Sequence, residues 1–217
     1  MALVFPRPLP CGIVTVEFEL SRGMAMNRLA GGSIQVRETA EPRWRCALTW
    51  APMQRAEYQA LRAWVDTMRG GLRTFLAHDA LQPYPVLYPK AKLLALTRPG
   101  GDAFDGTATV ASLSASAIGL TNLPVGFALK AGDYLGLVQS GRYGLHRLVE
   151  DATAAGPSGT LTASVEPRVA TNLFTTAAVA TVVRPSCTMV LDASPFSPSR
   201  SAASRAPVSL SGIQDLR

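Results

Sequence analysis

The chain has 217 residues, enough for one domain or for a domain that carries a second one of about 100 residues. Hydrophobic residues make up 47% of it and charged residues only 17%, which indicates a packed globular protein and excludes an intrinsically disordered one. The 21 Lys and Arg residues against 15 Asp and Glu give a net charge of +6, but the arginines stand singly. Sequence-specific nucleic-acid recognition is therefore not expected.

The cysteines and the first ten residues indicate the cellular compartment in which the chain folds. Cys11, Cys46 and Cys187 form neither a Cys-x-x-Cys pair nor a zinc-ligand spacing, so we interpret them as buried, reduced thiols. Residues 1–10 lack the charged start and continuous apolar stretch of a signal peptide. Because no apolar run is long enough to cross a bilayer, no membrane insertion is expected.

The first 50 residues predict an extended arm followed by strands. Prolines 6, 8 and 10 favour extended backbone, and an apolar–polar alternation then predicts a strand over 14–20. Residues 21–32, which contain glycine and methionine, predict a loop. Alternation resumes over 34–37 and again over 43–50, where Trp44, Cys46, Leu48 and Trp50 share one side.

An amphipathic helix is predicted over 53–69, with Pro52 at its start and Gly70-Gly71 at its end. Its apolar positions recur every three or four residues, at Tyr58, Leu61, Trp64, Val65, Met68 and Leu72. A helix of this length is marginal alone in water, so the stripe is expected to pack on the preceding sheet. A short strand through Phe75 follows, and the proline-rich stretch 83–89 closes this unit.

Residues 99–185 contain no convincing helix and are rich in Ala, Gly, Thr, Ser and Val. Short strands separated by turns are typical of a small sandwich or barrel. We expect them within 107–113, 120–129, 134–138, 145–149, 161–165 and 177–183. After Pro185 the pattern predicts a strand over 188–191, an exposed serine-rich loop over 194–204, and a last short element containing Val208, Leu210 and Ile213.

The fold class that follows is mainly β. We predict a β-sandwich flanked by one α-helix, formed by residues 1–98 and 186–217 with the helix over 53–69. Residues 99–185 are predicted to form an inserted, peripheral small β-sandwich or β-barrel domain.

The pair His78-Asp79 is the first candidate for chemistry. A hydrolytic triad would need a nucleophile beside the histidine, and the chain has no Gly-x-Ser-x-Gly elbow and no cysteine in a recognisable nucleophile context. A metal site would need more ligands, and the other histidine, His146, lies in a distant segment. We therefore interpret the pair as a strand-to-loop boundary at which the carboxylate accepts backbone hydrogen bonds.

The remaining candidates also have structural interpretations. The aspartates at 102, 105, 133 and 151 lack the spacing of a calcium loop, and turn chemistry explains Asp133. The glycine pairs at 31–32 and 100–101 lack the residues of a phosphate loop. Trp44, Trp50 and Trp64 are interpreted as core rather than as a sugar-stacking platform. No catalytic, cofactor-binding or metal-binding residue is predicted, no cofactor is expected, and the protein is predicted not to be an enzyme.

A series of segments carries a resemblance to a known family. Its N-terminal part is Arg43-Trp44, the helix through Tyr58, Leu61 and Trp64, Arg69-Gly70-Gly71 and Phe75-Leu76-Ala77-His78-Asp79. This series resembles the N-terminal domain of distal tail proteins of long-tailed bacteriophages and gene transfer agents. The insert carried by many such minor tail proteins is similar to Leu129-Lys130-Ala131-Gly132-Asp133-Tyr134, Leu145-His146-Arg147 and Pro185-Ser186-Cys187-Thr188-Met189.

The resemblance implies a structural role in the virion. Such proteins form a homo-hexameric ring at the tail tip, between the tail tube protein and the baseplate hub and tail-fibre or receptor-binding proteins. DNA passes through the lumen without sequence-specific binding during genome ejection. The implied location is the tail tip of the virion, after assembly in the bacterial host cytoplasm.

Two other classes of function stay open. Some family members bind carbohydrate with the insert, so a host-attachment module is the alternative. It would need an exposed aromatic platform within 99–185, where the aromatic residues are Phe104, Phe127, Tyr134, Tyr143 and Phe174. An enzyme such as a wall hydrolase, acting through His78, comes third.

Overall fold

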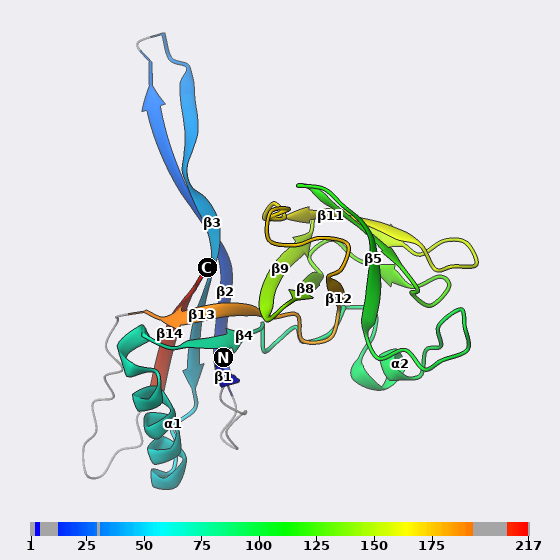
Figure 1. Ribbon diagram of the computed structural model, residues 1–217. Helices are drawn as coiled ribbons and strands as arrows, with labels where there is room; N and C mark the ends of the chain where they lie inside the picture. The colour runs from blue at the N-terminus through cyan, green and yellow to red at the C-terminus, as the bar shows by residue number, and fades with distance from the viewer. Residues whose placement is uncertain (1–2, 5–12, 30, 193–207, 217) are drawn as a thin grey trace. The chain divides into compact units, whose positions relative to one another are not determined.

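The structure, a computed structural model, describes residues 3–4, 13–29, 31–192 and 208–216. The fold is mainly β, as predicted. Contacts divide the chain into two compact units (Figure 1). We call Ala2–Phe75 with Met189–Arg217 the sheet unit, and Leu76–Thr188 the barrel unit. The predicted N-terminal arm over residues 5–12, Cys11 and the serine-rich loop over 194–204 lie outside the described residues.

A six-stranded sheet organises the sheet unit. Its strand order is β1-β4-β13-β14-β3-β2. The strands are β1 (Leu3–Val4), β2 (Ile13–Arg28), β3 (Ile34–Trp50), β4 (Thr74–Ala77), β13 (Cys187–Leu191) and β14 (Val208–Gln214). The strand predicted over 188–191 is thereby confirmed, and the last short element predicted around Leu210 is strand β14. β2 forms one end of the sheet and pairs antiparallel with β3 over almost its whole length.

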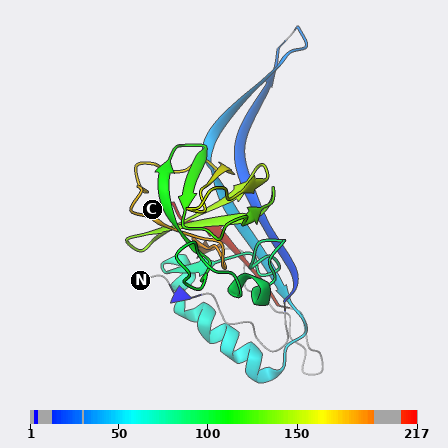
Figure 2. The ribbon, with the colours of Figure 1, turned by 90° about the vertical axis from the view of Figure 1, so that its right-hand side faces the viewer.

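The prediction of a loop over 21–32 is wrong, because β2 continues to Arg28 and the chain turns only after that residue. β3 likewise runs unbroken from Ile34 to Trp50, where two separate strands were predicted. The physical reason is a pair of register shifts around Gly23, which break the apolar–polar alternation. A Cβ at Gly23 would lie 3.0 Å from the Ala40 Cβ, so glycine permits this close approach. Figures 1 and 2 show the long hairpin that results.

Helix α1 (Arg55–Thr67) confirms the predicted helix within two residues at each end. The backbone N–H of Gln54 donates to Glu57 Oε2 at 2.9 Å in a capping box, which sets the start of the helix. A short 3-10 turn (Arg69–Gly71) with Gly70 at φ 64° ends it. This turn removes Leu72 from the predicted stripe, and Leu72 is 84% exposed.

The core of the sheet unit lies on the inner side of β3. Trp44, Leu48 and Trp50 are buried there, together with Phe75 of β4. Cys46 and Cys187 are buried thiols, as predicted, and burial raises the pKa of Cys46 to about 12. Trp64 is only half-buried: it lies edge-on to Phe75, with ring centroids 5.4 Å apart, so its assignment to the core is right only in part.

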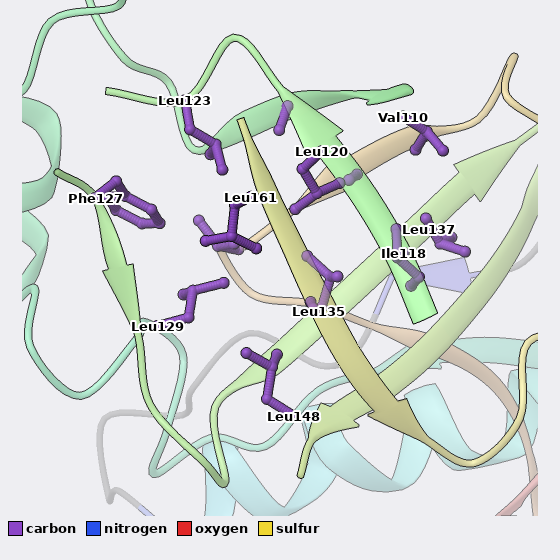
Figure 3. Close-up of a cluster of buried hydrophobic side chains, with 14 of the residues drawn as sticks. Val110, Ile118, Leu120, Leu123, Phe127, Leu129, Leu135, Leu137, Leu148 and Leu161 are labelled. Atoms are coloured by element: carbon purple, nitrogen blue, oxygen red, sulfur yellow. The ribbon is translucent and has the colours of Figure 1, made fainter. Parts of the chain in front are cut away.

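The second unit is built around a closed barrel. Of the two predicted forms, a small β-sandwich or a β-barrel, the structure has the barrel. Its strand order is β11-β6-β5-β12-β8-β9. The strands are β5 (Thr107–Leu113), β6 (Ala117–Thr121), β8 (Tyr134–Gln139), β9 (Arg142–Leu148), β11 (Leu161–Glu166) and β12 (Val179–Thr181). A separate pair, β7 (Ala128–Leu129) with β10 (Ala152–Thr153), completes the unit. Buried side chains such as Leu120, Leu135 and Leu161 form its core (Figure 3).

A second helix, α2 (Lys90–Leu94), was not predicted, so a single flanking helix and a sandwich are not confirmed. Tyr88 and Leu93 pack in the barrel core, although the sequence suggested that the insert begins at residue 99. The predicted domain boundaries stay a prediction. In the part of the chain that the structure describes, no helix has the length and apolar character needed to cross a bilayer.

Candidate functional site

His78 and Asp79 follow β4 directly, at the boundary that the sequence predicted. Asp79 Oδ1 accepts hydrogen bonds from the backbone N–H groups of Leu81 at 2.9 Å and Gln82 at 3.3 Å. This is the Asx-type turn that we predicted for the carboxylate. Oδ2 accepts a hydrogen bond from the Tyr134 hydroxyl at 3.3 Å.

The surroundings of His78 favour its neutral form. Burial lowers the pKa of the imidazole, and the positive charge of Arg184 lowers it further, whereas Asp79 opposes the shift. Beyond Asp79, Arg147 donates to the Tyr134 oxygen at 2.7 Å and stacks over the same ring at 5.0 Å. Burial raises the pKa of Tyr134, so its hydroxyl stays protonated and can donate to Asp79. These contacts form a structural network around a turn.

Asp133 is the residue whose role the sequence understated. It is 1% exposed, and its carboxylate accepts three hydrogen bonds. Oδ1 accepts from Val86 N at 2.9 Å and from Gln82 Nε2 at 3.2 Å, while Oδ2 accepts from Lys130 N at 2.8 Å. The last bond is the predicted turn chemistry. The other two hold residues 82–86 against the barrel, and only the structure reveals them.

His146, the second histidine, is buried in the barrel wall. Its Nδ1 lies 2.8 Å from the Pro167 carbonyl oxygen, and its Nε2 has no hydrogen-bond partner among the described residues. Burial lowers the pKa of this imidazole to about 4. The ring is therefore neutral at pH 7, with its proton on Nδ1 facing the carbonyl.

No metal centre emerges from the described residues, which hold no group of three or more His, Cys, Asp or Glu side chains able to bind an ion. Of the candidate aspartates, Asp133 binds backbone, Asp151 pairs with Lys130 at 2.6 Å and Asp105 pairs with Arg98. Each of these carboxylates thus takes part in a local structural contact.

An aromatic platform does not form in residues 99–185, all of which the structure describes. Four of the five aromatic side chains there are buried, namely Phe104, Phe127, Tyr134 and Phe174. Tyr143 is half-buried. A sugar-binding platform needs aromatic faces open to solvent.

The most unusual surface lies on the outer hairpin, by which we mean residues 23–40, of which Ala30 lies outside the description. β14 pairs only with the Arg45–Trp50 part of β3, and β2 ends the sheet. Both edges of the outer hairpin are therefore open among the described residues. Large apolar side chains gather on it, at Met24, Met26, Leu29, Ile34 and Val36.

The sequence contained a weak signal for this surface. Met24, Met26 and Arg28 alternate with Ala25 and Asn27, which is the period of a strand, but the glycines nearby favoured a loop. Once the register is known, the same alternation gives the hairpin one apolar and one polar face.

The chain matches no known protein-family description, and a search of curated proteins also finds no match.

Proposed function

We propose that this protein is a structural component of a phage tail tip, a homo-hexameric ring that joins the tail tube to the baseplate hub and fibres and encloses the DNA passage. The observation that carries the proposal is the open edge of the sheet unit. β2 offers a 16-residue strand with one side unpaired among the described residues. Free edges are templates for strand addition, and identical copies arranged head to tail close them in a ring.

The side-chain chemistry supports a structural role. The carboxylate oxygens of Asp79 and Asp133 accept hydrogen bonds from nearby turns and from the segment 82–86. His146 is neutral and buried in the barrel wall. Polar groups with such fixed, local partners stabilise a fold, whereas catalytic groups need a free atom aimed at a substrate. The proposal therefore includes the absence of enzymatic activity.

The finer architecture belongs to the same proposal. The sheet unit would act as the ring-forming sandwich with α1 as its flanking helix, and the barrel unit as the peripheral domain. The tail tube protein would bind one side of the ring, with hub and receptor-binding proteins on the other. DNA would pass through the lumen without base recognition, and the location would be the virion tail tip, after assembly in the host cytoplasm.

Sugar binding by the barrel unit is less well supported, because four of its five candidate aromatic residues are buried. An exposed platform is the feature that this alternative required. No specific observation favours it over the ring.

Electron microscopy of the purified full-length chain tests the proposal, and class averages with sixfold symmetry are the expected result. Two proline variants, Val16→Pro and Glu17→Pro, locate the contact on β2. Adjacent residues of a strand direct their N–H groups to opposite sides, so one of these prolines removes a bond to β3 and the other an outward-facing donor. The outward variant is expected to keep the tryptophan-monitored unfolding transition and lose the ring. Particles that stay monomeric at all concentrations, or rings in both variants, would contradict edge pairing.

A further inference from the structure

The outer hairpin has one face that is apolar and exposed. Met24, Met26, Ile34 and Val36 on this face are each between 52% and 65% exposed. A single exposed apolar residue is ordinary, but four neighbouring ones on a projecting ribbon are typical of an interaction surface. We call these four residues the apolar face.

The strand register fixes the layout of this face. Residues directly opposite in an antiparallel pair project to the same side. Three such rows follow one another from the hairpin end inward: Arg28 with Ile34, Met26 with Val36, and Met24 with Glu38. The apolar face therefore has a positive charge at one end and a negative charge at the other.

The opposite side of the ribbon is different. The intervening pairs are Ala25 with Arg37 and Asn27 with Gln35, which are small or polar. The ribbon is thus amphipathic, although no described part of the sheet unit pairs with its edges. Two-stranded ribbons are marginally stable in water without a further strand or a covering layer.

We propose that the apolar face binds the same face of a second copy of this chain, with the two hairpins antiparallel and related by a two-fold axis. The charges select this occupant and this direction. In the antiparallel arrangement each Arg28 lies level with Glu38 of the other copy, and the Met26–Val36 rows meet at the centre. In the parallel arrangement the two Arg28 side chains lie level with each other, as do the two Glu38 side chains, which is repulsive.

Two other observations agree with a protein occupant. Among the described residues, Glu38 forms a long ion pair with Arg22, at 3.8 Å between exposed side chains, which is weak enough to exchange for Arg28 of a second copy. A lipid bilayer would satisfy the apolar side chains but would leave the open backbone edges of the ribbon without hydrogen bonds.

This contact is separate from the ring. Ring closure uses the β2 edge in a head-to-tail manner, whereas the apolar face is self-complementary and pairs copies two at a time. It would join two chains or, where rings form, two rings. Failure of one contact therefore leaves the other in place.

The test compares two double variants of the full-length chain by light scattering and sedimentation. Met26→Asp with Val36→Asp places two charges at the centre of the apolar face, and we expect it to halve the mass of the wild-type particle. Asn27→Asp with Gln35→Asp adds the same charges to the next cross-strand pair on the opposite side, and we expect no change. Equal masses for the wild type and both variants would overturn the proposal.

Charge reversal tests the antiparallel arrangement. Arg28→Glu and Glu38→Arg each create like-charge pairs in a homotypic contact, and each is expected to weaken association by about tenfold. An equimolar mixture of the two variants restores both opposite-charge pairs and is expected to associate as the wild type does. A mixture that associates no better than either variant alone would contradict this arrangement.

The outcomes separate this proposal from the ring. Sixfold particles whose mass does not depend on Met26 and Val36 would overturn the homotypic contact and leave the ring. A particle of two chains that is halved by the aspartate variant, without sixfold symmetry, would do the reverse. Flotation with anionic phosphatidylserine vesicles that depends on Met26 and Val36, without self-association, would identify a bilayer as the occupant and overturn the proposal.

Discussion

The barrel unit and the sheet unit differ in their strand edges: the barrel closes on itself, whereas the sheet leaves edges open. In the barrel the order β11-β6-β5-β12-β8-β9 closes on itself, so every strand has two neighbours. Among the described residues of the sheet unit, β2 has one neighbour, and the part of β3 that precedes Arg45 pairs only with β2. Closure removes edges and makes a unit self-sufficient, whereas open edges are available to other chains.

The two units also differ in where their apolar side chains lie. The barrel encloses aromatic and aliphatic residues such as Phe104, Phe127 and Leu135. The sheet unit buries Trp44 and Trp50 but leaves Met26 and Val36 exposed on the outer hairpin. We therefore expect substitutions in the barrel to change stability and substitutions on the outer hairpin to change assembly.

The largest effect is expected for Phe127→Ala. Phe127 is buried, stacks on Tyr88 at 4.6 Å and lies edge-on to Phe104 at 5.3 Å. Deleting a buried ring costs about 3–5 kcal/mol in the free energy of unfolding. Chemical denaturation followed by circular dichroism measures this loss, while tryptophan fluorescence follows the sheet unit, which contains all three tryptophans. A loss below about 1 kcal/mol would remove Phe127 from the core.

The next effect depends on pH and arises from His146. Its pKa is about 4 in the folded protein and has the ordinary value of 6.5 when unfolded, so the unfolded chain binds more protons between these values. The contribution of neutral His146 to the free energy of unfolding is therefore fully present above pH 6.5. It is lost as the pH falls toward 4, by about 3 kcal/mol. Unfolding titrations of wild type and His146→Gln measure the difference. The same pH slope in both proteins would contradict this assignment.

Asp133→Ala is expected to destabilise the barrel unit by about 2 kcal/mol, because it leaves the amides of Val86 and Lys130 without their acceptor. Asp151→Ala is the matched control, since Asp151 is exposed and pairs with Lys130 at the surface. Thermal unfolding of both variants gives the comparison. An equal effect from the two substitutions would show that the burial of Asp133 is unimportant.

The smallest of the four effects belongs to the sheet unit. For a fully buried Trp64, truncation to alanine would cost about 3–5 kcal/mol in the free energy of unfolding. Trp64 is half-buried and contacts Phe75 edge-on, so we expect about 1–2 kcal/mol instead. Fluorescence of the remaining tryptophans reports the transition. A loss as large as that of Phe127→Ala would mean that this helix face is as tightly packed as the barrel core.

Much of the fold follows from local patterns in the sequence. The three- and four-residue spacing of Tyr58 and Leu61 defines α1, and apolar–polar alternation defines β11. The outer hairpin could not be predicted from the sequence, because register shifts near Gly23 break its apolar–polar alternation. Helix α2 has only five residues, too few to show a helical period.

The candidate site divides in the same way. The hydrogen bonds of Asp79 to nearby backbone could be predicted, because they join residues two and three apart. Those of Asp133 to Gln82 and Val86 could not, because they join residues 51 and 47 apart. The apolar face was hidden for a third reason: its four residues share a side only once the pairing of β2 with β3 is known.

Hydrogen exchange of the β2 amides over Thr15–Leu20 tests most directly the claim that the open edge pairs with another copy. Peptides from β2 and from barrel strand β8 would be compared in concentrated and dilute full-length protein. Edge pairing predicts that the outward amides of β2 are protected only in the concentrated sample, while those of β8 exchange equally in both. Equal exchange of the β2 amides at the two concentrations, in a sample that contains assembled particles, would contradict it.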